Sequence, residues 1–252
     1  MASFKGEAMH PILYKCGFLN IYTYGVFVAI AFLVSVTLLT QESRQRRFDE
    51  NVIYNFCFLV LTSGIVFARV FYVILNWSYF REDPFEILML QHGGLVWFGG
   101  LIGAGVSGLI FIKHKKLSAL AIFDLFAPYV ALAQAIGRIG CFYNGCCYGK
   151  ESPLGIYFPV HERILFPSQL LDSLSLLIIF VILRFLKPAK QGTIFAFYLM
   201  LASLQRFLLE FVRGDIRPFY FSLSIFQWIS IVVFGAGLLF YLILLWKKKT
   251  VL

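Results

Sequence analysis

The sequence predicts an all-α integral membrane protein with about seven transmembrane helices, and three observations support this: composition, the length of the apolar runs and the placement of charge. Of the 252 residues, 60% are hydrophobic and 14% are charged, and the mean hydropathy is +0.81. An ordinary globular domain has about 25% charged residues. A soluble core of this size cannot hide so much apolar surface, so the bilayer is the expected solvent.

A helix that crosses a bilayer needs about 20 apolar residues. Seven stretches meet or nearly meet that length, at about residues 19–40, 52–75, 95–112, 118–137, 168–186, 193–212 and 223–246. We predict a single polytopic domain over residues 1–252. The first run is full length and no small-residue cleavage site follows it, so no cleavable signal is expected. Polar residues 1–8 are interpreted as an N-terminal extension ahead of Met9.

The basic residues cluster at the ends of spans one, three, five and seven, which lie on one side of the membrane. Because Lys and Arg are enriched on the cytoplasmic face, we expect the N-terminus outside and the C-terminus in the cytoplasm. The net charge of +9 is therefore attributed to topology, and no nucleic-acid partner is predicted. The clusters are Arg44/Arg46/Arg47, Lys113/Lys115/Lys116, Lys187/Lys190 and Lys247/Lys248/Lys249.

With this orientation, the chemically unusual residues fall in outer segments, above all in a long loop predicted at residues 138–167. Long loops on a compact scaffold commonly carry function. The stretch Gly137–Gly149 reads GRIGCFYNGCCYG directly after an apolar run. An arginine, an amide and thiols at the end of a span point to anion binding or chemistry on the outer leaflet.

Three interpretations of Cys141, Cys146 and Cys147 stay open. An oxidising outer compartment allows a disulfide, whereas the spacing C-x4-C-C is weak evidence for zinc. Small polar packing under the loop is the third interpretation. No metal is predicted from the sequence.

Ionisable residues within spans are costly unless paired or hydrated, and each is a functional candidate. Arg206, Glu210 and Arg213 are spaced to share one helical face, which places one carboxylate between two guanidinium groups. Arg138 is expected on the same side of the membrane. Because arginine is the side chain best suited to phosphate, a lipid headgroup is the expected ligand. The other intramembrane candidates are Arg69, Asp124 and Asp172.

Glycines open the third span at Gly93, Gly94, Gly99 and Gly100. Small residues allow close helix approach, and unpaired N–H groups at a helix start attract anions. Both interpretations are retained for these four residues.

In chain order, several motifs resemble the prolipoprotein diacylglyceryl transferases, over residues 9–246. The most specific is Gly137-Arg-Ile-Gly-x-Phe-x-Asn-Gly-x-x-Tyr-Gly149. The others are His10-Pro-Ile-Leu, Tyr24-Gly25, Gly93-Gly-x4-Gly-Gly-Leu-Ile-Gly103, Pro167-Ser-Gln-Leu170 and Arg206-Phe-x-x-Glu-x-x-Arg213.

This resemblance implies an enzyme of the bacterial cytoplasmic membrane that moves the diacylglyceryl group of phosphatidylglycerol onto the lipobox cysteine of an exported prolipoprotein. It implies release of glycerol phosphate and no cofactor. By motif, the residues expected at the catalytic centre are Arg138, Arg206, Glu210 and Tyr24. Those expected to bind substrate are Arg138, Asn144, Gly149, Gln169, Arg213, Gly99 and Gly100.

The chain also departs from the family pattern. Phe98 stands where a His considered as a base is common, Cys141 and Cys146 replace an Asn and an acidic residue, and Ala202 replaces an aromatic residue. His92, His161, Glu210 and Tyr24 are the remaining candidates for handling the proton. The alternatives are a noncatalytic paralogue that binds phospholipid or precursor, and a transporter, although no internal repeat typical of transporters is seen.

Overall fold

The computed structural model describes residues 9, 11–16, 19–89 and 93–246, and its seven long apolar helices confirm the predicted spans. The helices are α1 (Thr23–Gln45), α2 (Glu50–Leu75), α4 (Trp97–His114), α5 (Ala119–Tyr143), α6 (Ser168–Phe185), α7 (Thr193–Leu209) and α8 (Ile225–Trp246). The proposed extension at residues 1–8, His92 and the last basic cluster lie outside the described residues.

Shorter elements connect these spans. They are α3 (Trp77–Phe80), the 3₁₀ helices η1 (Pro84–Leu88) and η3 (Glu210–Val212), and three antiparallel hairpins. The hairpins pair β1 (Ile12–Cys16) with β2 (Leu19–Tyr22), β3 (Glu151–Phe158) with β4 (Arg163–Leu165), and β5 (Phe219–Tyr220) with β6 (Leu223–Ser224).

Several predicted span boundaries differ from the structure, and two of them bear on the signature stretch and its surroundings. The first helix begins at Thr23 rather than near residue 19, because the preceding residues pair as the β1–β2 hairpin. The fourth helix continues to Tyr143 rather than ending at residue 137. The first half of the signature stretch is therefore helical, and the loop predicted from residue 138 begins after it.

The chain divides into two compact units, one formed by residues 1–39 and 123–252 and the other by residues 40–122. In the first unit, α5 packs its small side chains Ala127, Ala131 and Ala135 against α6 and α7. Small residues let helix backbones approach closely in a membrane, where packing drives association. At one end, Asp124 accepts the backbone N–H groups of Gly192 and Phe195 at 2.6 and 2.9 Å, which satisfies the start of α7.

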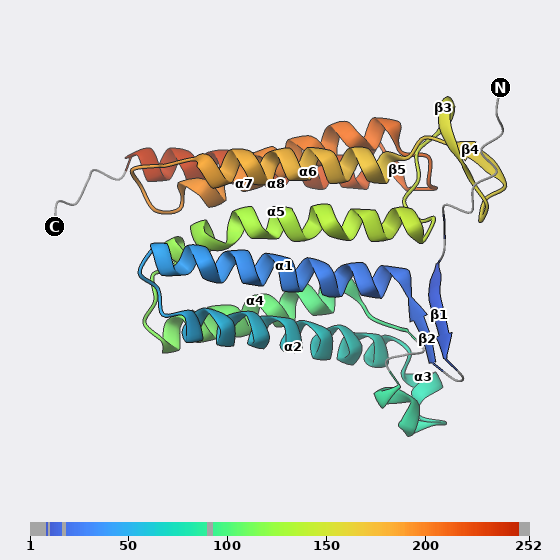
Figure 1. Cartoon of the computed structure of the whole chain (residues 1–252), viewed down its shortest axis with the longest axis horizontal. Coiled ribbons are helices and arrows are strands. Elements are labelled where there is room, and N and C mark those ends of the chain that lie inside the picture. Colours follow the sequence, from blue (N-terminus) through green and yellow to red (C-terminus); the bar gives the residue numbers. More distant parts are fainter. Residues whose placement is uncertain (1–8, 10, 17–18, 90–92, 247–252) are drawn as a thin grey trace. The chain divides into compact units, whose positions relative to one another are not determined.

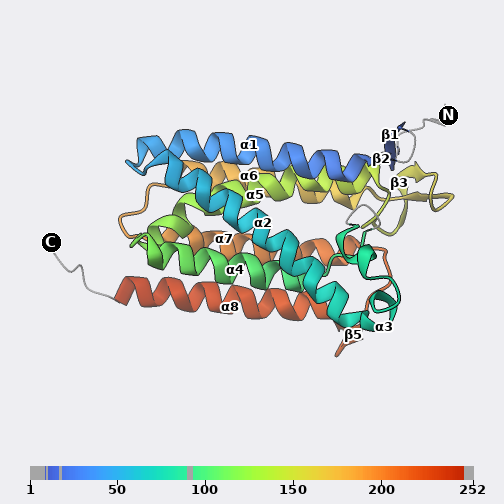
Figure 2. The same cartoon turned by 90° about the horizontal axis from the view of Figure 1, so that it is seen from below.

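In the second unit, α2 packs on α4, as Figure 2 shows. A Cβ added at Gly99 would lie 2.7 Å from the Phe67 carbonyl oxygen, and one at Gly100 would lie 3.2 Å from the Gly64 carbonyl oxygen. At Gly103, a Cβ would collide with the Phe67 ring. Helix packing therefore accounts for Gly99 and Gly100, and their predicted part in substrate binding stays a prediction.

Arg69 anchors the loop between α2 and α4 in this second unit. Its Nε donates to the Ile87 carbonyl at 2.9 Å, and its Nη1 donates to the carbonyls of Gly93 and Gly94 at 2.5 and 3.1 Å. Its Nη2 donates to the carbonyls of Glu86 and Met89. Both glycines have a φ of +81°, a conformation that turns their carbonyls without strain only because they lack a Cβ. Arg69, one of the intramembrane candidates, is thus a structural anchor.

Replacing Arg69 by Lys should destabilise the protein, because one ammonium group cannot reach carbonyls spread from residue 86 to residue 94. Hydrogen bonds to a charged group contribute about 1.5–3 kcal/mol each, so the unfolding free energy in detergent should fall by at least about 2 kcal/mol. Thermal denaturation measures the change, with the exposed Arg81→Lys as the matched control. Equal midpoints for the two variants would rule out the anchoring role.

Candidate functional site

Most residues predicted for the site belong to the first compact unit, at the end of its helices where α5 meets the β3–β4 hairpin (Figure 1). Four segments meet there: the end of α5 with the loop that follows, the start of α6, the end of α7 with η3, and the start of α8. Gly99, Gly100 and Phe98 belong to the second unit, where Phe98 is 64% exposed at the start of α4.

Gly149 joins three of these segments through its backbone. Its N–H donates to the Phe166 carbonyl at 2.9 Å, and it forms a β-bridge with Arg213. A Cβ at this position would lie 2.7 Å from the Phe166 oxygen and 2.8 Å from the Val212 oxygen. Real Cβ atoms do not approach backbone oxygens so closely, so only glycine allows this clamp. Gly149 thus has a structural role in shaping the loop, and its expected part in substrate binding stays a prediction.

The start of α6 fixes the cysteine-bearing part of the loop. Ser168 Oγ donates to the Cys147 carbonyl at 2.8 Å, and Gln169 Nε2 donates to the Cys146 carbonyl at 2.7 Å. Both side chains are fully buried. The structure therefore gives Gln169 a positioning role toward the loop, and direct contact of Gln169 with substrate stays a prediction. Asn144 hydrogen-bonds the Cys146 sulfur from within the loop.

Arg138 lies in α5 beside Asp172 of α6, with its Nε 2.8 Å from Asp172 Oδ2. The carboxylate also accepts a hydrogen bond from Gln205 Nε2 at 2.9 Å. Asp172 is 1% exposed, and its charge is compensated by the guanidinium. Arg138 is partly exposed, so the N–H donors that do not bind Asp172 are available to an anion such as phosphate.

Glu210 is the hub of a second charged network. It forms an ion pair with Arg206 at 2.8 Å and accepts hydrogen bonds from Arg217 Nη1 at 3.0 Å and from Ser224 Oγ at 2.8 Å. One carboxylate thus lies between two guanidinium groups, as predicted. The second guanidinium belongs to Arg217, however, and not to Arg213.

Arg213 was expected on the same helical face as Glu210, and this was wrong. The α-helix ends at Leu209, η3 follows, and Arg213 has an extended backbone with ψ of 141° that pairs with Gly149. Its guanidinium binds Asp215 through Nε and Nη2 at 2.9 and 2.8 Å. Burial acts to raise the pKa of Asp215. The hydrogen bonds from Arg213 and Arg217 outweigh this effect and hold that pKa below its usual value.

The arginines of this network leave donors for a ligand. The Nη1 of Arg206 is buried and has no hydrogen-bond partner among the described residues. Arg206 and Arg217 both stack on the Phe226 ring, at 5.2 and 4.4 Å from its centroid, which holds the two like charges side by side. The charges of Arg138, Arg213 and Arg217 all act on Arg206. Within the network the positive charges outnumber the carboxylates, so an anion is the complementary ligand.

Tyr24 lies near the signature helix, because its ring is 3.4 Å from a Cβ placed on Gly140. It is 44% exposed, and its phenol interacts electrostatically with Arg138 and with the nearby cysteines. Another candidate for the proton, His161, is engaged in the fold: its Nε2 lies 2.9 Å from the Gly145 carbonyl oxygen, and its ring packs on Tyr148.

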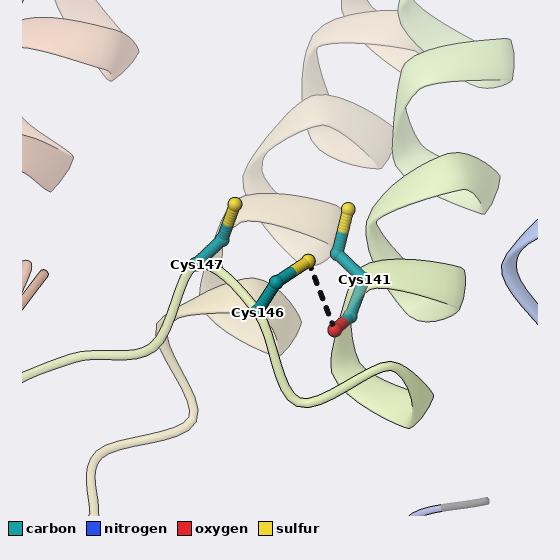
Figure 3. Close-up of side chains that lie close together, drawn as sticks. All are labelled: Cys141, Cys146 and Cys147. Atoms are coloured by element: carbon teal, nitrogen blue, oxygen red, sulfur yellow. Dashed lines mark hydrogen bonds between the residues drawn. The ribbon is translucent and has the colours of Figure 1, made fainter. Parts of the chain in front are cut away.

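Cys141, Cys146 and Cys147 are close together and are free thiols in the structure (Figure 3). The Cys146 thiol donates to the Cys141 carbonyl at 3.7 Å, and the neighbouring Cys141 and Cys146 thiols together with the Arg213 guanidinium lower the pKa of the Cys147 thiol. Of the three interpretations offered for these residues, the disulfide does not fit this structure, in which all three thiols are free.

Sequence reasoning missed three members of the site. Asp172 was a candidate only as an intramembrane charge, and no motif singled out Arg217 or Asp215. The signal for Arg217 was weak, because it lies seven residues after Glu210 and beyond the end of the helix. The turn after η3 brings Arg217 back to Glu210.

Comparison with known proteins gives the same assignment as the motifs. Residues 11–243 match the family model described as prolipoprotein diacylglyceryl transferase. A phosphatidylglycerol–prolipoprotein diacylglyceryl transferase of Clostridium tetani is 34% identical over 96% of this chain and 100% of its own length. A relative of that name from Clostridium perfringens, numbered 2, is 33% identical over 88% of this chain and 91% of its own. One from Pediococcus pentosaceus is 30% identical over 90% of this chain and 87% of its own.

The family model covers nearly every described span, and these relatives align over most of their own length. The chain belongs to the prolipoprotein diacylglyceryl transferase family.

Proposed function

We propose that the protein transfers the diacylglyceryl group of phosphatidylglycerol to the lipobox cysteine of exported prolipoproteins, at the outer leaflet of the bacterial cytoplasmic membrane. The observation that carries the proposal is the arginine-rich network around Glu210, together with Arg138. Its net positive charge and the unpartnered donor on Arg206 fit a phosphate at the end of the spans.

The reaction breaks the C–O bond between the diacylglyceryl carbon and the phosphate oxygen and forms a C–S bond to the lipobox sulfur. Glycerol phosphate leaves with the electron pair of the broken bond, and the thiol loses its proton. Charge therefore develops on the phosphate, and preorganised donors aimed there stabilise the transition state. Arg138 and Arg206 supply such donors, while Asp172 and Glu210 hold their guanidinium groups in place.

The remaining residues keep this arrangement assembled. Arg217 and Ser224 fix Glu210, and Arg213 ties the loop through Gly149 to the end of α7. Tyr24, placed beside the signature helix, is suited to line the lipid site. Asn144 shapes the loop through its hydrogen bond to Cys146.

A strong base is not required for the thiol. A thiol with a pKa near about 8.5 is already a few per cent ionised at neutral pH, and nearby arginines increase the thiolate fraction. The absence of a histidine at Phe98 is therefore compatible with activity.

The assumed orientation is tested by labelling single engineered cysteines with a membrane-impermeant maleimide in intact cells. Leu154→Cys, on a β3 residue that is 84% exposed, should be labelled. Lys115→Cys, in the exposed turn after α4, should react only after permeabilisation. The parent protein gives the background from native thiols. The reverse pattern would place the site in the cytoplasm and refute the proposal.

Arg138→Lys and Arg206→Lys should each reduce turnover strongly, because lysine keeps the charge but loses the planar fork that holds a phosphate. Removal of one preorganised donor costs about 10²–10³ in rate. The assay uses labelled phosphatidylglycerol and a lipobox peptide. Arg163→Lys is the matched control, because its side chain is 68% exposed on the β3–β4 hairpin and pairs with the exposed Glu151.

Normal turnover in a folded Arg138→Lys or Arg206→Lys protein would contradict phosphate stabilisation by that residue. An inactive parent protein that still binds phosphatidylglycerol would instead favour the noncatalytic paralogue.

Phe98→His should change turnover by less than about threefold. A general base contributes about 10²–10⁴, so a gain of that size would show that thiol activation depends on this position. Phe98 is exposed beside Trp97 at the start of α4, so the substitution removes little packing. Protein level and lipid binding are measured in parallel, and Phe98→Leu controls for loss of the ring.

A further inference from the structure

Three cysteine sulfurs gather beside the arginine network but have no part in the phosphate chemistry proposed for it. The Sγ atoms of Cys141, Cys146 and Cys147 all lie within 4.8 Å of one another, and Figure 3 shows Cys141 on the last turns of α5 beside Cys146 and Cys147 of the following loop. Cys141 is buried and the other two are half-buried. This arrangement resembles a set of metal ligands more than a chance packing of small side chains.

The backbone is strained in a way that brings the sulfurs together. Neighbouring side chains on an extended strand point to opposite sides, yet Cys146 and Cys147 share one side. Cys147 achieves this with a φ of +66°, in the left-handed region that costs a non-glycine residue about 1–2 kcal/mol. Ser168 and Gln169 hold the carbonyls of these two cysteines and so maintain the turn.

The separation fits one ion between three sulfurs. With a Zn–S bond of about 2.3 Å, three sulfurs around one ion lie about 4 Å apart, so small side-chain rotations close the cluster. A disulfide requires two sulfurs at about 2.05 Å and leaves the third thiol without a function. Three soft donors in one cluster select zinc, Cu(I) or iron–sulfur centres.

Charge compensation is also present. Three thiolates and one divalent ion carry a single net negative charge, which is costly to bury without a partner. The Arg213 guanidinium hydrogen-bonds the Cys147 sulfur, and the charge of Arg138 acts on Cys141. Both arginines therefore lower the cost of an anionic metal–thiolate complex.

We propose that Cys141, Cys146 and Cys147 form a binding site for one closed-shell thiophilic metal ion, Zn²⁺ or Cu(I), with a further position open toward solvent. Binding replaces the thiol protons by metal–sulfur bonds, releases those protons to solvent and transfers no electron. The ion fixes the loop that carries Asn144 and Gly149.

The test uses the full-length protein in detergent, without a histidine tag, reduced and freed of metal under nitrogen. One portion is titrated with Zn²⁺, using Cd²⁺ as a spectroscopic substitute that gives a thiolate charge-transfer band. The other is titrated with Cu(I) in competition with a chromophoric chelator. We expect one equivalent of at least one of the two ions to bind, and the arms identify which.

Cys146→Ser and Cys147→Ser should each weaken binding by at least about 100-fold, because even loss of an outer-shell partner costs about 10–100-fold in metal affinity. Cys57→Ser, which removes a buried thiol of α2, should leave the affinity unchanged. Thermal denaturation without metal checks that each variant is folded. The replacement Cys146→Asp keeps an anionic ligand and should retain more affinity than Cys146→Ser.

The proposal is overturned if the reduced protein binds neither ion in stoichiometric amount, or if binding survives in Cys147→Ser. Because these measurements do not depend on turnover, an inactive protein that binds metal would refute the proposed transferase activity and leave this site intact.

Discussion

The constraint on which the first compact unit depends is the need to neutralise charge at the rim of a low-dielectric membrane. Glu210 meets it by accepting from residues of three segments: Arg206 in α7, Arg217 in the following loop and Ser224 at the end of β6. An unpaired carboxylate at this depth would cost several kcal/mol. The ion pairs therefore hold the end of α7 to the returning chain, and they set the spacing of the Arg206 and Arg217 guanidinium groups.

The intramembrane arginines serve two different purposes, which their contacts distinguish. The Arg69 guanidinium donates to backbone carbonyls, which are neutral, and these hydrogen bonds use its donors. Arg138 and Arg206 are paired with carboxylates and keep an exposed or unpartnered edge. A saturated guanidinium stabilises a loop, whereas an unsaturated one remains available to a substrate. Arg69, Arg138 and Arg206 are all arginines within spans, so only their partners distinguish a structural role from a functional one.

The fold was largely predictable because hydropathy over about 20 residues is a property of local sequence. The errors arose where nonlocal pairing decides the backbone. The residues of β2 run directly into the apolar α1, and the glycines around Arg138 resemble loop residues although α5 continues through them. The pairing of Arg206 with Glu210 follows from helical spacing. Arg217 does not, because its position depends on the turn after η3, which no local pattern specifies.

The carbonyl cage around Arg69 also bears on how the protein enters the membrane. During synthesis, α2 leaves the ribosome before residues 86–94, so the guanidinium reaches the translocon without its acceptors. An arginine at the centre of an isolated inserting helix costs about 2.5–3.5 kcal/mol, and less near its end. Arg69 thus finds its hydrogen-bond partners only when the loop between α2 and α4 has formed. We therefore expect α2 and α4 to insert as a pair rather than one span at a time.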